Sequence, residues 1–477
     1  MFGLYSLKQL EKKHKISIRY AKHLILNKHL EAVVKNGRVF VTEESLKKFL
    51  SKPKKERKEH HKGFLKKIGP GIITGAADDD PSGIGTYSTV GAKFGLGLSW
   101  MALYLLPMMS AVQETCARIG IVTGKGLAGA LKKKFGNVTV FILVSMLVIA
   151  NTINIGADIG AIAASVRMIT GMNFYVAAIL FTVIIICLEV FVKYHQYAKI
   201  LRWLVLSLLA YIITGIIIKP DWMEVLRSLA VPKVQFNLDY IFAIVAVIGT
   251  TISPYLFFWQ SSQEVEEKRD DGTLGDHHAA IINEEVHEMR KDVISGMSIA
   301  NLVFLFIVIT TAFVLFKNGI TNIETAEQAA AALEPLAGEF ASLIFTLGIV
   351  GTGLLAIPVL AGASAYAISE VLKWHEGLSL KFKHAHGFYG IIIISTFVGL
   401  LMNLVGINPI TALYYAAVIN GLVASVLLIF IFKIGNDKEI MGVHTNPGWV
   451  KIFGTIAMIF MGLSSLILIG AFILGIK

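Results

Sequence analysis

Long apolar stretches follow one another along most of this chain, and they limit what it can fold into. From residue 68 onward there are eleven, each able to cross the roughly 30 Å hydrocarbon core of a bilayer. They lie near residues 68–92, 95–117, 138–166, 174–192, 200–218, 238–262, 293–316, 340–371, 387–405, 410–432 and 450–475. In lipid a helix satisfies its own backbone hydrogen bonds. The sequence therefore predicts an all-α polytopic membrane protein with about eleven transmembrane helices.

Composition agrees with a membrane location and argues against a soluble enzyme. The 477 residues are 55% hydrophobic and 16% charged, whereas soluble domains are about 45–50% apolar and about 25% charged. No span shows a nucleophile-and-base arrangement, so we expect no enzyme and no cofactor. The two cysteines, Cys116 and Cys187, fall in apolar stretches, and this count excludes a disulfide framework.

Charge separates a basic amino-terminal segment from the rest of the chain. Residues 1–67 hold nineteen Lys and Arg against six Asp and Glu, whereas the remainder is nearly balanced at twenty-five against twenty-seven. We expect a small unit over residues 1–50, a basic linker over 51–67 and a transmembrane domain over 68–477. The polar start lacks the apolar segment of a signal peptide.

The basic residues of the loops predict an orientation. With the amino-terminal segment inside, the inner loops contain eighteen Lys and Arg and the outer side contains seven. Basic residues concentrate on the cytoplasmic side of membrane proteins. We therefore expect a multi-pass protein of the inner or plasma membrane of the cell. Its amino terminus would be cytoplasmic and its carboxyl terminus outside.

The first apolar stretch is interrupted by charge. It contains Asp78, Asp79 and Asp80, followed directly by Pro81. Carboxylates at mid-depth are costly in lipid, and a proline disfavours helical geometry in the residue before it. These features predict a broken helix whose unwound backbone and Asp80 face an aqueous cavity. The alternative, a loop with the helix starting after Pro81, leaves too few residues for a crossing.

The sixth stretch repeats the interruption. Gly249 and Pro254 bracket two threonines and Ser253 within an apolar run. An ordinary proline kink is the alternative to a break. Broken helices at the first and sixth positions are typical of two inverted repeats of five helices. The sequence therefore predicts two such repeats plus one helix, with a midplane site between the breaks.

At these residues the chain resembles the NRAMP family of divalent-metal transporters. Asp80-Pro81-Ser82-Gly83 stands where the family has Asp-Pro-Gly-Asn, and Gly156-Ala157-Asp158 is similar to its third-span aspartate segment. Further similar motifs, in the family's order, lie at residues 69–71, 118–128, 329–333, 345–349 and 439–442. The resemblance implies a secondary-type transporter with a divalent cation as its substrate. It also implies a cation site between spans 1 and 6.

The resemblance implies metal ligands around the two breaks. Asp80 matches the aspartate that binds metal in the family. Ala77 and Thr250 match positions that offer backbone carbonyls. Asp78 and Asp79 add carboxylates where the family pattern is apolar, and we include Asp79 among the expected ligands.

Three departures fall at the site itself. Gly83 stands in place of the family's asparagine, Ser253 in place of its methionine, and Tyr255 in place of its histidine. Thioether sulfur favours softer transition metals, whereas carboxylate, carbonyl, hydroxyl and water oxygens favour hard ions. Mg²⁺ gives up water reluctantly, and small residues at 83 and 253 leave room for it. We therefore expect Mg²⁺, as in the NRAMP-related magnesium transporter branch, with Mn²⁺ next; Ser253 bonded to the backbone of a kink is the alternative.

Span 3 carries further polar residues. Asp158 matches a residue of the family's proton route, but Ala161 replaces the neighbouring glutamate and span 9 has no arginine. We therefore expect proton coupling to be weak or absent. Asn151 and Asn154 lie three residues apart; interhelical hydrogen bonding is their expected role, and lining the transport path is the alternative.

Other functions stay open at this point. One alternative is a proton-coupled symporter for transition metals such as Mn²⁺ or Fe²⁺. Another is an amino-acid or small-solute symporter of the same architecture, although Asp80 would repel a substrate carboxylate. A third is a membrane-tethered regulator with the basic segment as its output.

The first fifty residues resemble a winged helix-turn-helix of the excisionase and MerR type. Apolar residues recur at helical spacing up to residue 25, Asn36-Gly37 predicts a hairpin turn between short strands, and Thr42 begins a last helix. The positive charge would suit nucleic acid, the anionic inner leaflet or a protein contact.

A polar segment separates spans 6 and 7. Residues 263–292 hold ten acids, four bases and three histidines, on the side expected to be cytoplasmic. We expect a solvated acidic loop in which residues 283–290 form a short polar helix. A cytoplasmic cation sensor is the alternative.

Overall fold

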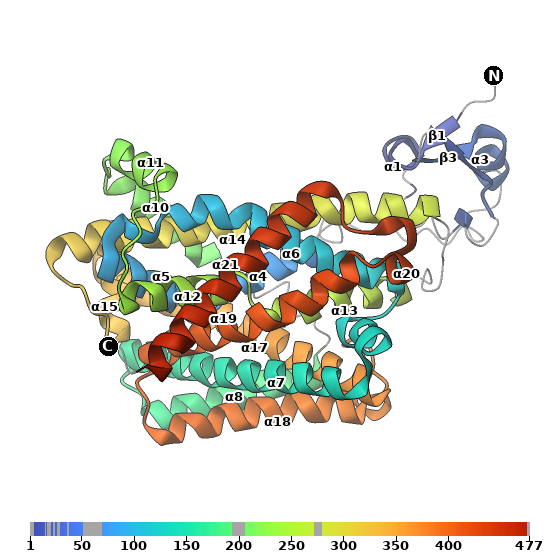
Figure 1. Cartoon of the computed structure of the whole chain (residues 1–477). Helices are drawn as coiled ribbons and strands as arrows, with labels where there is room; N and C mark the ends of the chain where they lie inside the picture. The colour runs from blue at the N-terminus through green and yellow to red at the C-terminus, as the bar shows by residue number, and fades with distance from the viewer. Residues whose placement is uncertain are drawn as a thin grey trace.

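Helices make up nearly all of the described chain beyond residue 69 (Figure 1). The computed structural model describes residues 4–14, 16, 21, 24–25, 29–35, 38–50, 69–192, 206–270 and 279–474. Within these ranges eight helices are long and apolar enough to cross a membrane, or nine if a pair bent by 107° is one span. The helical membrane fold is thus confirmed in outline. The total of eleven crossings stays a prediction.

The first part of the helical domain runs from α4 to α10. Its helices are α4 (Pro70–Asp78), α5 (Pro81–Phe94), α6 (Trp100–Thr123), α7 (Leu127–Thr170), α8 (Phe174–Phe191) and α10 (Leu209–Ile217). α7 bends at Gly136, whose φ of 78° is left-handed. The third predicted span is the part of α7 that follows this bend. The start of the fifth predicted span lies outside the described residues.

The second part follows a short helix, α11 (Trp222–Ala230). Its helices are α12 (Leu238–Thr251), α13 (Pro254–Asp270), α14 (Ala279–Val314), α15 (Ala326–Ala330), α16 (Glu334–Ala337), α17 (Ala341–Leu372), α18 (His386–Met402), α19 (Pro409–Gly435), α20 (Lys438–Met441) and α21 (Gly448–Ile473). Short 3-10 turns cover Gly95–Leu98, Leu206–Leu208, Phe316–Asn318, Ala331–Leu333, Gly338–Phe340, Phe382–His384, Asn403–Val405 and Gly442–His444.

Both predicted helix breaks are confirmed. α4 ends at Asp78 and α5 begins at Pro81, and Asp80 between them has extended backbone with φ −69° and ψ 171°. α12 ends at Thr251 and α13 begins at Pro254. In each case a proline opens the second half-helix, where its missing N–H leaves no helical hydrogen bond unmade.

Glycines bring the broken helices into backbone contact with their neighbours. A Cβ atom at Gly75 of α4 would lie 2.4 Å from the carbonyl oxygen of Gly296 in α14. A Cβ atom at Gly249 of α12 would lie 1.9 Å from the carbonyl oxygen of Ala417 in α19. Neither crossing has room for a side chain, so α4 packs backbone to backbone on α14 and α12 does so on α19.

A carboxylate from α14 caps the amino end of α4. Asp292 Oδ1 accepts a hydrogen bond from Gly69 N at 3.2 Å, and Asp292 Oδ2 accepts one from Gly71 N at 2.6 Å. The first amides of a helix have no partner within it. The cap of this half-helix therefore comes from a residue more than two hundred positions further along the chain.

The acidic segment between spans 6 and 7 is more helical than the solvated loop that we expected, and the short helix predicted over residues 283–290 is part of α14. α13 continues to Asp270 and α14 begins at Ala279, so much of it is helical. Glu264, Glu266 and Lys268 are at most 7% exposed. α13 packs against α6 and α17. These neighbours supply partners such as the carbonyl of Ile121, which accepts from Lys268 Nζ at 3.2 Å.

The amino-terminal unit contains a small antiparallel sheet. Its strands β1 (Leu4–Ser6), β2 (Ala32–Lys35) and β3 (Arg38–Thr42) lie in the order β1-β3-β2, beside α1 (Leu7–His14) and α3 (Glu43–Leu50). Lys35 pairs with Arg38, as expected for the predicted hairpin. The helix expected near residues 18–25 and the linker over 51–67 lie mostly outside the described residues. The winged-helix resemblance and binding to nucleic acid stay predictions.

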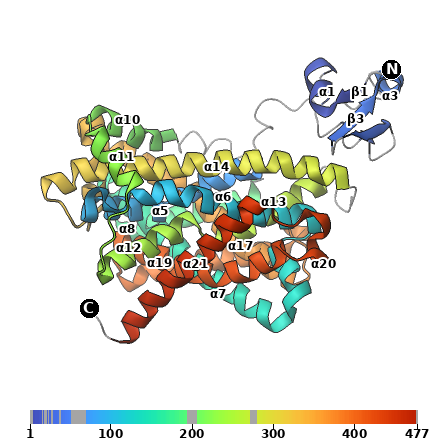
Figure 2. The same ribbon diagram turned by 45° about the horizontal axis from the view of Figure 1, so that its top comes forward.

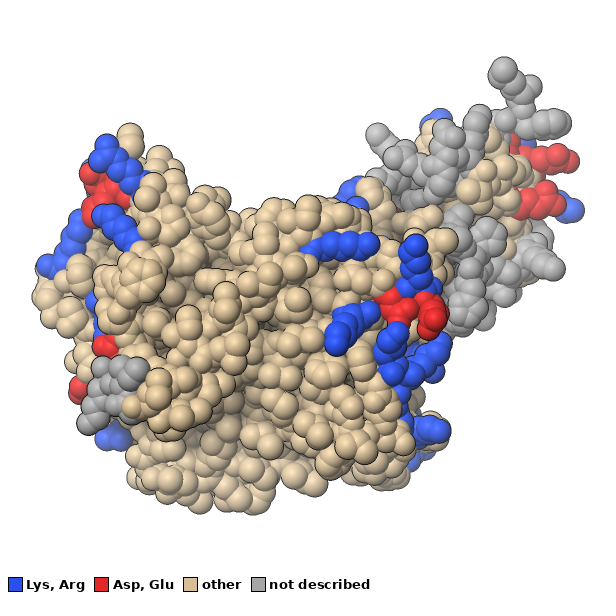
Figure 3. Space-filling model, viewed as in Figure 1, with Lys and Arg blue, Asp and Glu red and all other residues tan. Residues whose placement is uncertain are grey.

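Charge gathers at the two ends of the helix bundle. Figure 3 shows a broad band without Lys, Arg, Asp or Glu between two charged ends. One end carries α11, whose Glu224 pairs with Lys317, and the other carries α20, which follows Asp437 and its partner Lys134 (Figure 1). The amino-terminal unit and the end of α21 lie at opposite ends of the bundle in two views (Figures 1 and 2). This distribution is typical of a protein that spans a bilayer.

Candidate metal-binding site

Asp80 lies in the break of the first helix and caps its second half. Its Oδ1 accepts a hydrogen bond from Gly83 N at 2.6 Å, and the side chain is 1% exposed. The extended backbone at Asp80 follows from Pro81, which disfavours helical geometry before it. The sequence of the break therefore buries a carboxylate in the middle of the bundle.

Asp80 also meets the third span. Asn154 of α7 donates from Nδ2 to Asp80 Oδ2 at 2.8 Å and to Asp158 Oδ2 at 3.3 Å. Asn420 of α19 donates from Nδ2 to Asn154 Oδ1 at 3.2 Å. The structure thus places the predicted residues Asp80 and Asp158 in one hydrogen-bonded network, joined by two asparagines.

Ser253 uses its hydroxyl on its own helix. Ser253 Oγ donates to the carbonyl oxygens of Gly249 at 2.7 Å and Thr250 at 2.9 Å. This arrangement is the alternative noted for Ser253 in the sequence, a hydroxyl bonded to the backbone at a kink. The carbonyl of Thr250, which the resemblance implies as a ligand, accepts this hydrogen bond.

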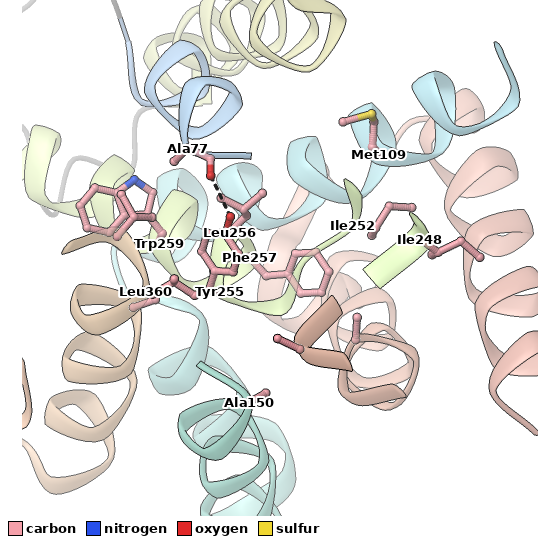
Figure 4. Packing of buried hydrophobic residues seen from close by; sticks show 14 of the residues in the cluster. Ala77, Met109, Ala150, Ile248, Ile252, Tyr255, Leu256, Phe257, Trp259 and Leu360 are labelled. Atoms are coloured by element: carbon pink, nitrogen blue, oxygen red, sulfur yellow. Dashed lines mark hydrogen bonds between the residues drawn. The ribbon is translucent and has the colours of Figure 1, made fainter. Parts of the chain in front are cut away.

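Tyr255 reaches the carbonyl at the end of α4. Tyr255 Oη donates to the carbonyl oxygen of Ala77 at 2.8 Å, and Figure 4 shows the two residues facing each other across the breaks. Tyr255 is 1% exposed. Both carbonyls that the resemblance implies as ligands therefore accept hydrogen bonds from residues that depart from the family pattern, Ser253 and Tyr255.

A side chain at position 83, where this chain has glycine, would be surrounded by oxygen atoms. A Cβ atom there would lie 3.2 Å from Thr250 Oγ1, 3.2 Å from the Asp78 carbonyl oxygen and 3.4 Å from Asp80 Oδ1. Thr250 Oγ1 is buried and lies beside the hydroxyl group of Tyr87 of α5. Thr250, Gly83 and Asp80 thus lie close together. Thr250 offers its hydroxyl oxygen, in addition to its carbonyl oxygen, near the Asp80 carboxylate.

The other two acids of the break are buried as well. Asp78 and Asp79 are 1% and 2% exposed, and Oδ1 of each has no hydrogen-bond partner among the described residues. A buried carboxylate without a counter-charge is unfavourable unless a cation or a proton joins it. The break therefore concentrates carboxyl groups in the interior of the bundle.

This site offers oxygen ligands of several chemical kinds. No three His, Cys, Asp or Glu side chains within the described ranges are placed to hold a metal ion together. A cation here would use carboxylate, hydroxyl and carbonyl oxygens together with water. That set suits hard divalent ions.

A second series of hydrogen bonds runs from α4 to the start of the acidic segment on α13. Thr74 Oγ1 donates to Gln260 Oε1 at 2.5 Å, and Gln260 Nε2 donates to Glu264 Oε1 at 2.9 Å. All three side chains are buried. Polar groups therefore continue from the break along α13.

Sequence reasoning missed the partners of Asp80. Asn151 and Asn154 were both expected to bond between helices and both do, Asn151 with Ser364 of α17 at 2.9 Å and Asn154 with Asp80 at 2.8 Å, but Asp80 was not named as a partner. Asn420 was not singled out. Its one available signal is an amide in the middle of the apolar tenth stretch, because polar residues inside spans are rare and often functional.

Three comparisons place this architecture among known proteins. The family model described as natural resistance-associated macrophage protein-like (Nramp) matches residues 71–471. Two relatives are named divalent metal cation transporter MntH. The protein of Klebsiella pneumoniae (strain 342) is 26% identical over 410 residues, covering 85% of this chain and 94% of its own. The protein of Yersinia enterocolitica is 26% identical over 412 residues, covering 85% and 95%.

A solved structure has the same fold. The manganese transporter of Eremococcus coleocola, in complex with an aromatic bis-isothiourea substituted compound, superposes with a TM-score of 0.68 at 17% identity. The match covers 84% of this chain and 86% of that chain. At this level of identity the likeness concerns the fold alone.

Proposed function

Because this chain belongs to the Nramp family, we propose that it carries divalent metal cations across a membrane, with Mg²⁺ as the leading substrate and Mn²⁺ as the next. The relatives are named as transporters, which confirms the expectation that the chain is not an enzyme. Transport would be of the secondary type, through a midplane site between the breaks of α4–α5 and α12–α13. The expected ligands are Asp80, Asp79, Ala77, Thr250, Gly83 and Ser253.

One observation carries this proposal, the buried acids of the first break. Asp78, Asp79 and Asp80 are all at most 2% exposed, and the groups that hydrogen-bond Asp80 are the neutral amides of Gly83 and Asn154. A dication would supply the charge that these carboxylates lack. An amino-acid substrate would instead bring its own carboxylate toward them, which disfavours the symporter alternative.

The preference for Mg²⁺ rests on two hydroxyl groups. The carbonyl oxygens of Thr250 and Ala77 already accept hydrogen bonds from Ser253 and Tyr255, which weakens them as ligands for a fully dehydrated ion. Gly83 removes a side chain that would have filled the space among three oxygens. A cation that keeps part of its water shell fits these conditions.

The direct test is uptake by the purified protein in liposomes. At a fixed inside-negative potential we expect saturable uptake of Mg²⁺ and Mn²⁺ and little uptake of amino acids. Uptake of an amino acid without uptake of either metal would overturn the proposal. A protein lacking residues 1–67 that still transports would weaken the alternative of a membrane-tethered regulator.

Substitution of Ser253 is expected to shift ion preference. Ser253→Met supplies a sulfur ligand and releases the Thr250 carbonyl, so uptake of Cd²⁺ and Mn²⁺ should rise several-fold relative to Mg²⁺. Ser253→Ala releases the carbonyl without adding sulfur, and it should shift Mn²⁺ but not Cd²⁺. The measurement is the ratio of initial rates at equal ion concentrations. Unchanged ratios in both variants would place Ser253 outside the site.

Proton coupling is expected to be weak or absent. Tyr255 replaces the family's histidine with a phenol, and a phenol ordinarily titrates near pH 10. A dication entering at 100 mV, negative inside, gains about 4.6 kcal/mol, enough for a gradient on the order of 10³-fold without protons. A pH-sensitive dye inside the liposomes should show no acidification during metal entry. Acidification that saturates with the metal would assign a proton route through Asp158.

The location follows the same proposal. A multi-pass protein of the inner or plasma membrane would have its amino-terminal unit in the cytoplasm and the end of α21 outside. The opposite placement of these two parts in Figures 1 and 2 supports it. So does the excess of Lys and Arg over residues 1–67.

A further inference from the structure

An amide on α7 joins the two acids of the site. Asn154 Nδ2 lies 2.8 Å from Asp80 Oδ2 and 3.3 Å from Asp158 Oδ2, and its side chain is 0% exposed. An amide nitrogen has two hydrogens, so each carboxylate can receive one. The two N–H groups also offset the repulsion between the carboxylates while no cation is bound.

Asn420 on α19 supports the orientation that the two carboxylates select for this amide. Asn420 Nδ2 donates to Asn154 Oδ1 at 3.2 Å. If the Asn154 amide turned over, its NH₂ group would face that of Asn420 and its oxygen would face two carboxylates. The network therefore selects one orientation, with the NH₂ group toward the acids.

The consequence is an Asp80 carboxylate held at both oxygens. Gly83 N holds Oδ1 at 2.6 Å and Asn154 holds Oδ2 at 2.8 Å. Groups that orient a ligand in this way commonly determine its metal affinity. We infer that Asn154 is a positioning residue for Asp80, supported in turn by Asn420; this inference rests on the proposed function.

The motif at the first break, Asp80-Pro81-Ser82-Gly83, lacks the family's asparagine. The Asp-Pro-Gly-Asn motif of the family brings an amide three residues after its aspartate, and this chain has Gly83 there. Asn154 brings an amide to the same carboxylate from another helix. In this chain the side-chain amide that contacts Asp80 therefore comes from the third span.

Two unpartnered oxygens belong to the same network. Asp158 Oδ1 and Asn420 Oδ1 are buried and have no hydrogen-bond partner among the residues described here. Their residues are 0% and 1% exposed. Acceptors left in this state favour a cation or a donor nearby, which is consistent with a network built to serve a cation rather than only to pack helices.

The test compares leucine variants of the two asparagines in the full chain. Initial uptake of Mg²⁺ and of Mn²⁺ is measured over a range of concentrations in liposomes. Asn154→Leu should raise the apparent KM about 10–100-fold, with little change in the maximal rate per inserted protein. Asn420→Leu should raise it less, and the double variant should match Asn154→Leu because Asn420 acts through Asn154.

Asn151 provides the matched control on the same helix. It is buried like Asn154 and donates to the Leu360 carbonyl at 3.1 Å and to Ser364 Oγ at 2.9 Å, both on α17. Asn151→Leu should lower thermal stability and leave the KM unchanged. A wild-type KM in Asn154→Leu, an equal rise in Asn151→Leu, or additive effects in the double variant would overturn the inference. Wild-type protein that neither takes up nor is thermally stabilised by Mg²⁺ or Mn²⁺ would instead overturn the proposed function and the inference together.

Discussion

An Asp80→Ala protein is expected to insert into the membrane and to take up divalent cations more than about 100-fold more slowly than wild type. Loss of a group that only orients a metal ligand already costs about 10–100-fold in affinity, and here the ligand itself would be missing. The measurement is the initial rate of Mg²⁺ and Mn²⁺ uptake, normalised to inserted protein. Normal uptake by a well-inserted variant would end the assignment of the site.

Two further variants, Asp80→Asn and Asp221→Ala, separate the loss of charge at Asp80 from the loss of a helix cap. Asp80 also caps α5, so its loss removes a helix cap as well as a charge. Asp80→Asn keeps a capping oxygen and removes the charge, and it should be as inactive as Asp80→Ala. Asp221 caps α11 by accepting hydrogen bonds from Met223 N and Glu224 N at an exposed position. Asp221→Ala should retain uptake, because it removes a cap away from the site.

Gly249→Val is expected to prevent assembly of the bundle. At this position even a Cβ atom would lie 1.9 Å from the Ala417 carbonyl oxygen and 2.5 Å from Gly421 N, which are both backbone atoms. Backbone cannot swing aside as a flexible side chain can, so α12 and α19 would have to separate. Fluorescence-detected gel filtration should show loss of the monodisperse peak and a large fall in yield.

Gly390 of α18 is the matched control for that substitution. It also lies inside a membrane helix, and a Cβ atom there would meet nothing within 4 Å. Gly390→Val introduces the same β-branched side chain and should keep the peak and the uptake. Equal behaviour of the two variants would show that the α12–α19 contact is not what limits folding.

The breaks could be predicted from the sequence because their causes are local. Pro81 and Pro254 each open a half-helix, and a proline affects mainly the residue before it and the turn that it begins. The position of the acids in the chain placed Asp80 at the first break without any knowledge of its neighbours. The N-terminal hairpin was predictable for the same reason, since Lys35 and Arg38 flank its turn.

The partners across helices could not be predicted in this way. Asn151 and Asn154 look alike in the sequence, yet one bonds α17 and the other bonds Asp80. Which face of α7 meets the first break depends on the packing of the whole bundle. Glu266 looked solvated because it lies in an acidic run, but its carboxylate accepts from the backbone of Ser379 at 2.7 Å. Burial of this kind is a property of tertiary contacts rather than of composition.

The cap that Asp292 places on α4 sets an order of events during biosynthesis. Gly69 and Gly71 leave the ribosome more than 220 residues before the side chain that satisfies their amides. At ordinary translation rates that interval lasts about 10–45 s. Throughout it, the first half-helix has no Asp292 to cap it and no Gly296 to pack against. Its final position must therefore be a late event, completed after the seventh span has entered the membrane rather than when the first one does.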